Sequence, residues 1–268
     1  MGQRVVMPTY DLIDLYSEPE VNRVSGFAEA ARKLDMDALC NAYSYLVQHA
    51  PKRRLTKKSY FQTNHKGLPS GEGVSNRREE HLALALFNQS RQFDFPGGRD
   101  LEIIDYQTPL KSRQGDKGVG KIDLFGVIDN SIPAVIELKV KGIKGRKADT
   151  PLRALLEGLA YCAIVEANLA DIADEAKSIF HLHIAHTRPD LLVLAPNDYW
   201  RSYLSKPSTG GWFQLLQNLI TEIGQKLHLN VHLVSLEDAD FEMGSSEKHP
   251  KLINQCYMAP LCLKKFSF

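Results

Sequence analysis

Two acidic residues and one lysine stand in neighbouring stretches that alternate between apolar and polar residues. Asp123 lies in KIDLFGVID, and Glu137 and Lys139 lie in AVIELKVK. This pattern predicts two antiparallel strands joined by a turn near Asn130. Residues that face each other in such a hairpin have numbers that sum to about 260, which places Asp123 opposite Glu137. Because facing residues share one face of a sheet, both carboxylates and Lys139 are expected side by side.

This arrangement suits a divalent cation. Two carboxylates about 5 Å apart repel each other, which raises one pKa unless a positive charge lies between them. Carboxylate oxygens are preferred ligands of Mg²⁺ and Mn²⁺, and a metal held by them can activate water beside a phosphate group. Two alternatives remain open. A register shift of one residue would separate the acids, and an exposed sheet face can carry the same residues as ordinary cross-strand pairs.

The segment GKIDLFGV followed by PAVIELKVK resembles the catalytic hairpin of the PD-(D/E)XK nuclease superfamily, which has the restriction-endonuclease-like fold. The family motif is an Asp on one strand and Glu-x-Lys on the next, matched by Asp123, Glu137 and Lys139. Ile122 replaces the name-giving Pro. The resemblance implies that Asp123, Glu137 and the backbone carbonyl of Leu138 bind Mg²⁺ or Mn²⁺. It also implies that Lys139 orients or deprotonates the attacking water.

Many members of this family contribute a further acid from the helix before the first strand. Asn76 and Glu79 have the spacing of a capping box at the start of EEHLALALFNQS, which gives Glu79 a structural explanation. Glu80 is therefore the predicted metal-proximal acid, with Glu79 as the alternative. Some members also carry Gln-x-x-x-Tyr on the helix after the third strand. Tyr161 matches the second residue, but Glu157 replaces the Gln and cannot donate a hydrogen bond as an amide does.

The elements that position these residues follow from the spacing of apolar residues. Predicted helices cover 26–49 in two pieces, 79–90, a segment starting at Thr150-Pro151, 198–204 and 212–227. Predicted strands cover 101–110, 121–129, 134–141, 179–187, 191–196 and 231–237. The order of helix, three strands, helix and strand over residues 76–187 matches the family core. The predicted fold class is α/β, a restriction-endonuclease-like mixed β-sheet flanked by helices with an N-terminal helical extension.

The stretch HKGLPSGEGVSN is rich in Gly and Ser, and it predicts a boundary between two parts of the chain. We expect an N-terminal helical extension over residues 1–75, a nuclease-like core over 76–240, and a C-terminal tail over 241–268 that packs on the core.

Composition supports a globular protein and excludes several classes. The 268 residues are 43% hydrophobic and 24% charged, unlike disordered, collagen-like or disulfide-scaffold chains. The four cysteines lie far apart without CxxC spacing, which favours a reducing compartment. Because no run of about 18 apolar residues occurs, we expect a cytoplasmic protein without membrane association.

The net charge of +1 hides two basic runs. Residues 52–58 hold five Lys or Arg residues, which either neutralise phosphates or form a solvated face. The second run begins inside a predicted strand. The residues predicted to hold the backbone of a nucleic acid are Lys121, Lys141, Lys144, Arg146 and Lys147.

These features predict a Mg²⁺-dependent nuclease, a phosphodiester hydrolase, with DNA as the first expected substrate. A nuclease of the same fold that cuts RNA or acts in defence or restriction is one alternative. A non-catalytic nucleic-acid-binding protein that retains the fold is another, and a small-molecule enzyme with a coincidental trio is a third. A second copy of the chain or a partner protein is a further expected partner.

Overall fold

A mixed sheet forms the centre of the molecule. The computed structural model describes residues 11–62, 78–89, 92–142, 148–204, 211–237, 241–243, 250–252 and 256–262. The strands are β1 (Gln92–Phe95), β2 (Arg99–Pro109), β3 (Lys121–Ile128), β4 (Ile132–Leu138), β5 (Asp190–Pro196), β6 (Val231–Glu237), β7 (Phe241–Met243), β8 (Pro250–Leu252) and β9 (Tyr257–Pro260). Seven of them form one sheet in the order β1-β2-β3-β4-β5-β6-β9, and β7 pairs with β8.

Helices connect and cover these strands. They are α1 (Leu12–Ser17), α2 (Phe27–Lys33), α3 (Met36–His49), α4 (Arg78–Gln89), α5 (Pro151–Ala167), α6 (Leu169–Phe180), α7 (Asn197–Leu204) and α8 (Trp212–Leu227), with a 3-10 turn, η1 (Arg54–Thr56). Strands β1 to β4 are antiparallel neighbours, whereas β4, β5 and β6 run parallel. The parallel pairs require crossovers, which α5 and α6, and then α7 and α8, supply.

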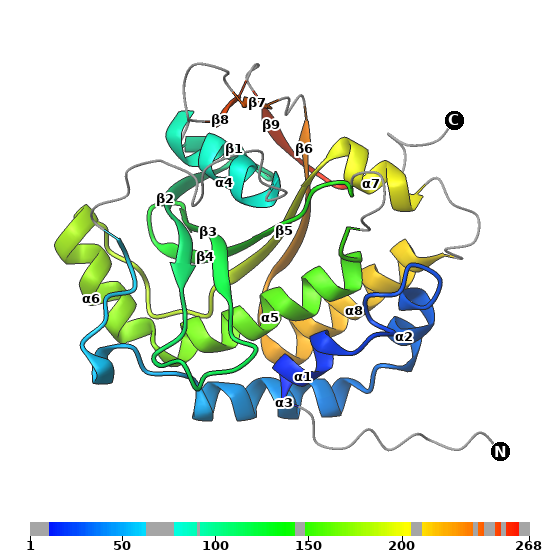
Figure 1. The fold of residues 1–268 in the computed structure, drawn as a ribbon, viewed down its shortest axis with the longest axis horizontal. Coiled ribbons are helices and arrows are strands. Elements are labelled where there is room, and N and C mark those ends of the chain that lie inside the picture. The colour runs from blue at the N-terminus through cyan, green and yellow to red at the C-terminus, as the bar shows by residue number, and fades with distance from the viewer. Residues whose placement is uncertain are drawn as a thin grey trace.

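Each face of the sheet is covered by its own hydrophobic cluster. Alternate strand residues such as Val135 and Val193 pack with α5, α8 and the N-terminal helices. Their neighbours Ile136 and Leu192 pack with α4 on the other face. Figure 1 shows α4 on one side of the strands and α5 with α8 on the other. This period of two is what places Glu137 and Lys139 on the face toward α5.

Most predicted elements are confirmed, including the mixed α/β class. The predicted strand over 179–187 is wrong, because α6 continues to Phe180 and the sheet strand that follows is β5. The apolar residues Leu169, Ile172 and Ala176 have helical spacing, and this period extends through the start of the predicted strand. The predicted order of helix, three strands, helix and strand also gains β1 and α6, and its last strand, β5, ends at Pro196 rather than at residue 187.

The stretch 65–76, with Asn76 and the boundary at residue 75, lies outside the described residues. The apolar spacing did not predict α1, α6, β1, β7, β8 or β9. Within the described part of the chain, no helix has both the length and the apolar character that crossing a bilayer requires.

Candidate functional site

The β3–β4 hairpin has the predicted register. Its pairs run from Ile128 with Ile132 to Leu124 with Ile136, so that paired numbers sum to 260. The next residue on β3 is Asp123, whose Oδ2 accepts a hydrogen bond from the Leu138 N–H at 3.0 Å. A side chain thus replaces the backbone ladder at this end of the hairpin. Asp123 and Glu137, the residue that follows Ile136 on β4, are consequently neighbours on one face of the sheet.

A second donor orients the Asp123 carboxylate. Gln107 lies across from Asp123 on β2, and its Nε2 donates to Asp123 Oδ1 at 3.1 Å. The β2–β3 register shifts between Ile103 and Asp105, and Gln107 has a positive φ of 52°. Such irregularities re-aim side chains beside functional sites. Sequence reasoning missed Gln107, because a bulge changes the register and leaves no periodic signal.

Glu137 and Lys139 form a buried ion pair next to Asp123. Lys139 Nζ lies 2.7 Å from Glu137 Oε1, and the two side chains are 4% and 3% exposed. The other carboxylate oxygen, Glu137 Oε2, is buried without a hydrogen-bond partner. An unpartnered charged oxygen in the interior is costly, so a further cation at this position would be stabilising.

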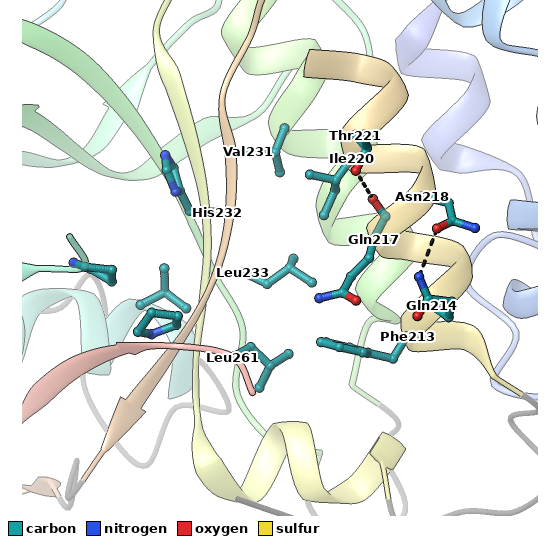
Figure 2. Close-up of a pocket in the computed structure, with 13 residues that line it drawn as sticks. Phe213, Gln214, Gln217, Asn218, Ile220, Thr221, Val231, His232, Leu233 and Leu261 are labelled. Carbon is teal, nitrogen blue, oxygen red and sulfur yellow. Dashed lines mark hydrogen bonds between the residues drawn. The ribbon is translucent and has the colours of Figure 1, made fainter. Parts of the chain in front are cut away.

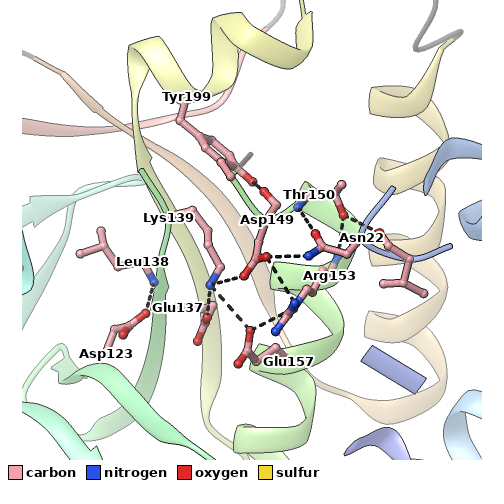
Figure 3. A network of polar contacts seen from close by, with 12 residues as sticks. Asn22, Asp123, Glu137, Leu138, Lys139, Asp149, Thr150, Arg153, Glu157 and Tyr199 are labelled. Atoms are coloured by element: carbon pink, nitrogen blue, oxygen red, sulfur yellow. Dashed lines mark hydrogen bonds and ion pairs between the residues drawn. The ribbon is translucent and has the colours of Figure 1, made fainter. Parts of the chain in front are cut away.

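Two acids and an arginine near the start of α5 complete the site. Lys139 Nζ lies 3.6 Å from Asp149 Oδ2 and 3.6 Å from Glu157 Oε2. Arg153 lies between these acids, with Nη1 3.3 Å from Asp149 Oδ1 and Nε 3.8 Å from Glu157 Oε2. Figure 3 shows this group, which we call the Lys139 cluster. It consists of Asp123, Glu137, Lys139, Asp149, Arg153 and Glu157.

The residues from α5 were mostly absent from the sequence prediction. Asp149, Arg153 and Glu157 follow one another at a spacing of four, which places such residues on one face of a helix. This spacing would have grouped Asp149 and Arg153 with Glu157 and Tyr161, which the resemblance alone indicated. Tyr161 donates from its hydroxyl to Glu157 Oε1 at 2.9 Å. Burial raises the pKa of Tyr161, and the nearby Glu137 and Glu157 charges raise it further. Tyr161 therefore remains a hydrogen-bond donor.

Of the two adjacent acids on α4, the structure brings Glu79 to the Lys139 cluster. Glu79 accepts a hydrogen bond from the Val140 N–H, and its charge contributes to the raised pKa of Asp123. The charge of Glu80 instead acts on Tyr106 of β2. This reverses the predicted order. Residues 81–87 of α4 are all buried, so the helix has no polar face from which to tell which acid turns toward the sheet.

The carboxylates outnumber the cations around Lys139. Burial raises the pKa of Asp123 to about 7, although the Lys139 charge opposes this shift. Burial also raises the pKa of Glu137 well above its usual value, again opposed by Lys139. Burial alone would lower the pKa of Lys139, but the surrounding acids, Glu137 first, hold it well above normal. The ammonium is therefore charged, while the two strand acids repel each other.

The donor set fits a hard divalent cation. The unpartnered Glu137 Oε2 is joined by Asp123, which accepts from the N–H of Leu138, the residue after Glu137. In the described residues, no group of three or more His, Cys, Asp or Glu side chains is arranged to hold a metal ion. A Mg²⁺ ion would therefore take two carboxylates and complete its octahedron with backbone oxygen and water.

The predicted nucleic-acid contacts are only partly described. Lys121 begins β3 and Lys141 follows β4, and both side chains are exposed. The β3–β4 ladder ends at the pair of Leu124 and Ile136, so Lys121 and Lys139, whose numbers also sum to 260, are not paired in it. Lys144, Arg146 and Lys147 lie outside the described residues.

The first basic run, residues 52–58, makes contacts within the molecule. Arg53 is buried and donates to the carbonyls of Ser59 and Lys111. Lys52 donates to the carbonyl of Ala167 at the end of α5, and Arg54 lies 3.0 Å from Asp171. Arg53 and Lys52 are therefore held by backbone carbonyls of the fold, so the run is not simply a solvated face, and phosphate binding by its exposed residues stays a prediction.

A pocket elsewhere lacks comparable chemistry. It measures about 420 Å³ and lies between α8 and β6, where Gln214, Gln217 and Thr221 face Val231 and Leu233 (Figure 2). Its lining holds amide, hydroxyl and apolar groups, and its one titratable side chain is His232. That ring lies 3.3 Å from Asp190 Oδ2. The described residues that line the pocket include no carboxylate, thiol or lysine, so we place the candidate site at the Lys139 cluster.

Comparison with known proteins finds no family model, no curated protein and no solved structure that matches this chain. The functional argument therefore rests on the residues and their geometry.

Proposed function

We propose that this chain is a metal-dependent nuclease that hydrolyses phosphodiester bonds, with DNA as its substrate. One observation carries the proposal. At the open end of the β3–β4 hairpin, Asp123 adjoins a Glu137 whose Oε2 has no partner and whose Oε1 is bound by Lys139. Acid, acid and lysine in this arrangement provide two metal-binding oxygens beside a group that can orient water.

The restriction-endonuclease-like fold is part of the same proposal. Its support is the order of elements, in which α4 precedes the antiparallel strands β2, β3 and β4. Helix α5 then begins the crossover to β5, which runs parallel to β4. The proposed site lies at the end of the hairpin toward α5.

The proposed chemistry divides roles among the residues. A bound Mg²⁺ or Mn²⁺ would supply a Lewis acid that acidifies water and offsets charge on the phosphate. Asp123, Glu137 and the Leu138 carbonyl would hold it. Gln107 and the Leu138 N–H fix the Asp123 carboxylate while leaving lone pairs on both oxygens. Lys139, which carries three N–H donors, would orient the attacking water and hold its charge beside the phosphate.

Substrate would approach from the partly exposed side of the site. Asp149 and Arg153 are 27% and 30% exposed at their side chains, whereas Glu137 and Lys139 are almost fully buried. The exposed Lys121 and Lys141 flank the same hairpin end and would contact phosphates. Such contacts hold the backbone and do not read sequence.

The decisive experiment is a cleavage assay on the purified full chain. Labelled single-stranded and double-stranded DNA and RNA are incubated with Mg²⁺, Mn²⁺ or EDTA. We expect cleavage of DNA that EDTA abolishes. Glu137→Gln and Asp123→Asn should abolish it as well, and Lys139→Met should lower kcat by roughly 10²–10⁴-fold. Lys226→Met is the matched control, since Lys226 pairs with Asp37 at the surface.

Different outcomes separate the alternatives. Cleavage of RNA alone would replace the substrate but keep the site. Binding without cleavage under all metals would favour a non-catalytic nucleic-acid-binding protein. Activity that survives EDTA or Glu137→Gln would contradict the proposed metal site.

A further inference from the structure

Asp149 contacts Lys139 from outside the hairpin. One oxygen, Oδ2, lies 3.6 Å from Lys139 Nζ. The other, Oδ1, accepts a hydrogen bond from Asn22 Nδ2 at 2.7 Å and lies 3.3 Å from Arg153 Nη1. Figure 3 shows Asn22 and Arg153 on the side of Asp149 away from Lys139. The carboxylate is thus held by one oxygen and presents the other to the lysine.

The backbone around Asp149 is fixed by separate contacts. Its carbonyl accepts hydrogen bonds from the hydroxyls of Tyr199 and Tyr203 at 2.9 and 3.0 Å. The Thr150 N–H donates to Asn22 Oδ1 at 2.9 Å, so Asn22 bridges a side chain and the next peptide group. Segments before α2, at the start of α5 and in α7 therefore meet at one residue.

The position of Asp149 is important because the closest partner of Lys139, Glu137, would also bind the metal. In the proposed nuclease, Glu137 would contact both Lys139 and the metal. The ammonium then needs other acceptors to stay in one position, because a lysine stem is flexible. Glu157 Oε2 lies 3.6 Å away, and its Oε1 accepts from Tyr161. Asp149 Oδ2 lies at the same distance, and its Oδ1 is anchored by Asn22 and Arg153.

We propose that Asp149 is a positioning residue for Lys139, and that Asn22 holds Asp149 in this role. The segment between α1 and α2 then belongs to the active site rather than to a detached extension. This inference rests on the proposed nuclease function. It predicts that displacing the Asp149 charge slows turnover without weakening substrate binding.

A reciprocal exchange tests the role of the charge apart from the hydrogen bond. Asn22→Asp combined with Asp149→Asn keeps a carboxylate and an amide in contact. The carboxylate at position 22 can still accept from the Thr150 N–H and from the new amide. The pair therefore remains bonded, but the negative charge moves away from Lys139.

The matched control is a second Asp–Asn pair at the opposite end of the sheet. Asn230 Nδ2 donates to Asp190 Oδ1 at 2.9 Å, and Asp190 also has a cation, Arg99, at 3.5 Å. Asp190 begins β5 and pairs with Ala134, three residues along the strands from Glu137. Asn230→Asp with Asp190→Asn is the corresponding exchange.

We expect the Asn22/Asp149 exchange to melt at a higher temperature than Asp149→Asn alone. Its kcat on labelled DNA should nevertheless fall on the order of 10²-fold, with KM changed by less than about twofold. Asn22→Ala, which keeps the charge and removes only the tether, should lower kcat in the same direction. The Asp190/Asn230 exchange should leave kcat and KM unchanged.

Several results would overturn the inference. An exchange that restores both the melting temperature and kcat would reduce the pair to a structural tether. A loss confined to KM would make Asp149 a substrate contact. If the exchange protein does not fold, full kcat in the Asn22→Ala protein would overturn the inference instead. A wild-type chain that cleaves no nucleic acid with Mg²⁺ or Mn²⁺ would instead overturn the proposed function, and this inference with it.

Discussion

At the scale of single residues, the two strand acids oppose folding in the metal-free protein. Burial holds the pKa of Asp123 at about 7, and Glu137 has a raised pKa for the same reason. A cation between them would remove the repulsion. If the group were purely structural, the acids would instead stabilise the metal-free fold. Loss of either acid would then leave the buried Lys139 charge with less compensation.

Asp123→Asn should therefore stabilise the metal-free protein at pH 8. The pKa of Asp123 is about 7 when folded against about 3.9 in an unfolded chain, so the folded state binds its proton more tightly. The stability that this proton contributes is present below about pH 4 and is lost as the pH rises through 7. The difference in melting temperature between variant and wild type should be positive at pH 8 and shrink toward pH 5.

Asp129→Asn provides the control with the opposite sign. Its hydrogen bond with Arg99 lowers the pKa of Asp129, so its stabilising contribution is present at neutral pH and lost as the pH falls. Thermal melts in EDTA across this pH range check both variants. A metal-free Asp123→Asn protein that melts below wild type at pH 8 would identify a structural pair.

The sequence predicted residues that depend on regular strands. Asp123, Glu137 and Lys139 come together because the hairpin register follows from a short turn and a period of two. Gln107 could not be placed this way, because it depends on a bulge. The spacing of four groups Asp149 with Arg153 and Glu157, but its anchoring by Asn22 and α7 leaves no period in the sequence. Irregular backbone carries no period, so its side chains can be placed only from the fold.

At the scale of elements, the segment after α3 is fixed by its cations. Arg53 is 8% exposed and bonds the carbonyls of Ser59 and Lys111, and its guanidinium lies 5.8 Å from the Tyr60 ring centre. The segment therefore joins η1 to the stretch after β2. A cluster of basic residues in a sequence can bind phosphates or donate hydrogen bonds within the fold. Only the positions of the backbone acceptors distinguish these two roles.

Arg53→Ala should destabilise the protein by about 1–3 kcal/mol, because buried carbonyls lose their donor. Urea unfolding measures this loss. Lys57→Ala is the control in the same run, since Lys57 is exposed, and it should change stability by less than about 0.5 kcal/mol. Equal effects of the two substitutions would show that the run is a solvated face, and an Arg53→Ala protein of normal stability but weaker DNA binding would return it to phosphate binding.

The helices and strands that were predicted are those with a clear sequence period or a clear capping residue. Helix α5 was found from Thr150 and Pro151, and the structure confirms Thr150 as the N-cap, with its side chain accepting from the Arg153 N–H. The predicted strand over 179–187 failed because alternating His and apolar residues imitate a period of two. In α6 the longer helical period prevails, and Ala176 and Phe180 lie one turn apart.

At the scale of the whole molecule, the N-terminal helices share the main hydrophobic cluster. Leu39 of α3 and Leu12 of α1 are 1% and 0% exposed, in the same cluster as Leu155 of α5. Phe27 of α2 lies 5.7 Å, ring centre to ring centre, from Trp212 of α8. Elements from the two ends of the chain thus bury one another, which favours unfolding as a single unit.

Leu39→Ala tests this cooperativity when urea unfolding is followed by both tryptophan fluorescence and circular dichroism. The cavity should cost about 2–5 kcal/mol, whereas Leu55→Ala, at a leucine that is 83% exposed, should cost almost nothing. The only tryptophans, Trp200 and Trp212, lie in α7 and α8, far from Leu39 along the sequence. Because α3 packs on α5 and α8, tryptophan fluorescence and far-UV circular dichroism should shift to lower urea by the same amount. If the dichroism shifts while the tryptophan transition stays in place, the N-terminal helices form a separate unit, and their proposed contribution to the active site through Asn22 would lose its support.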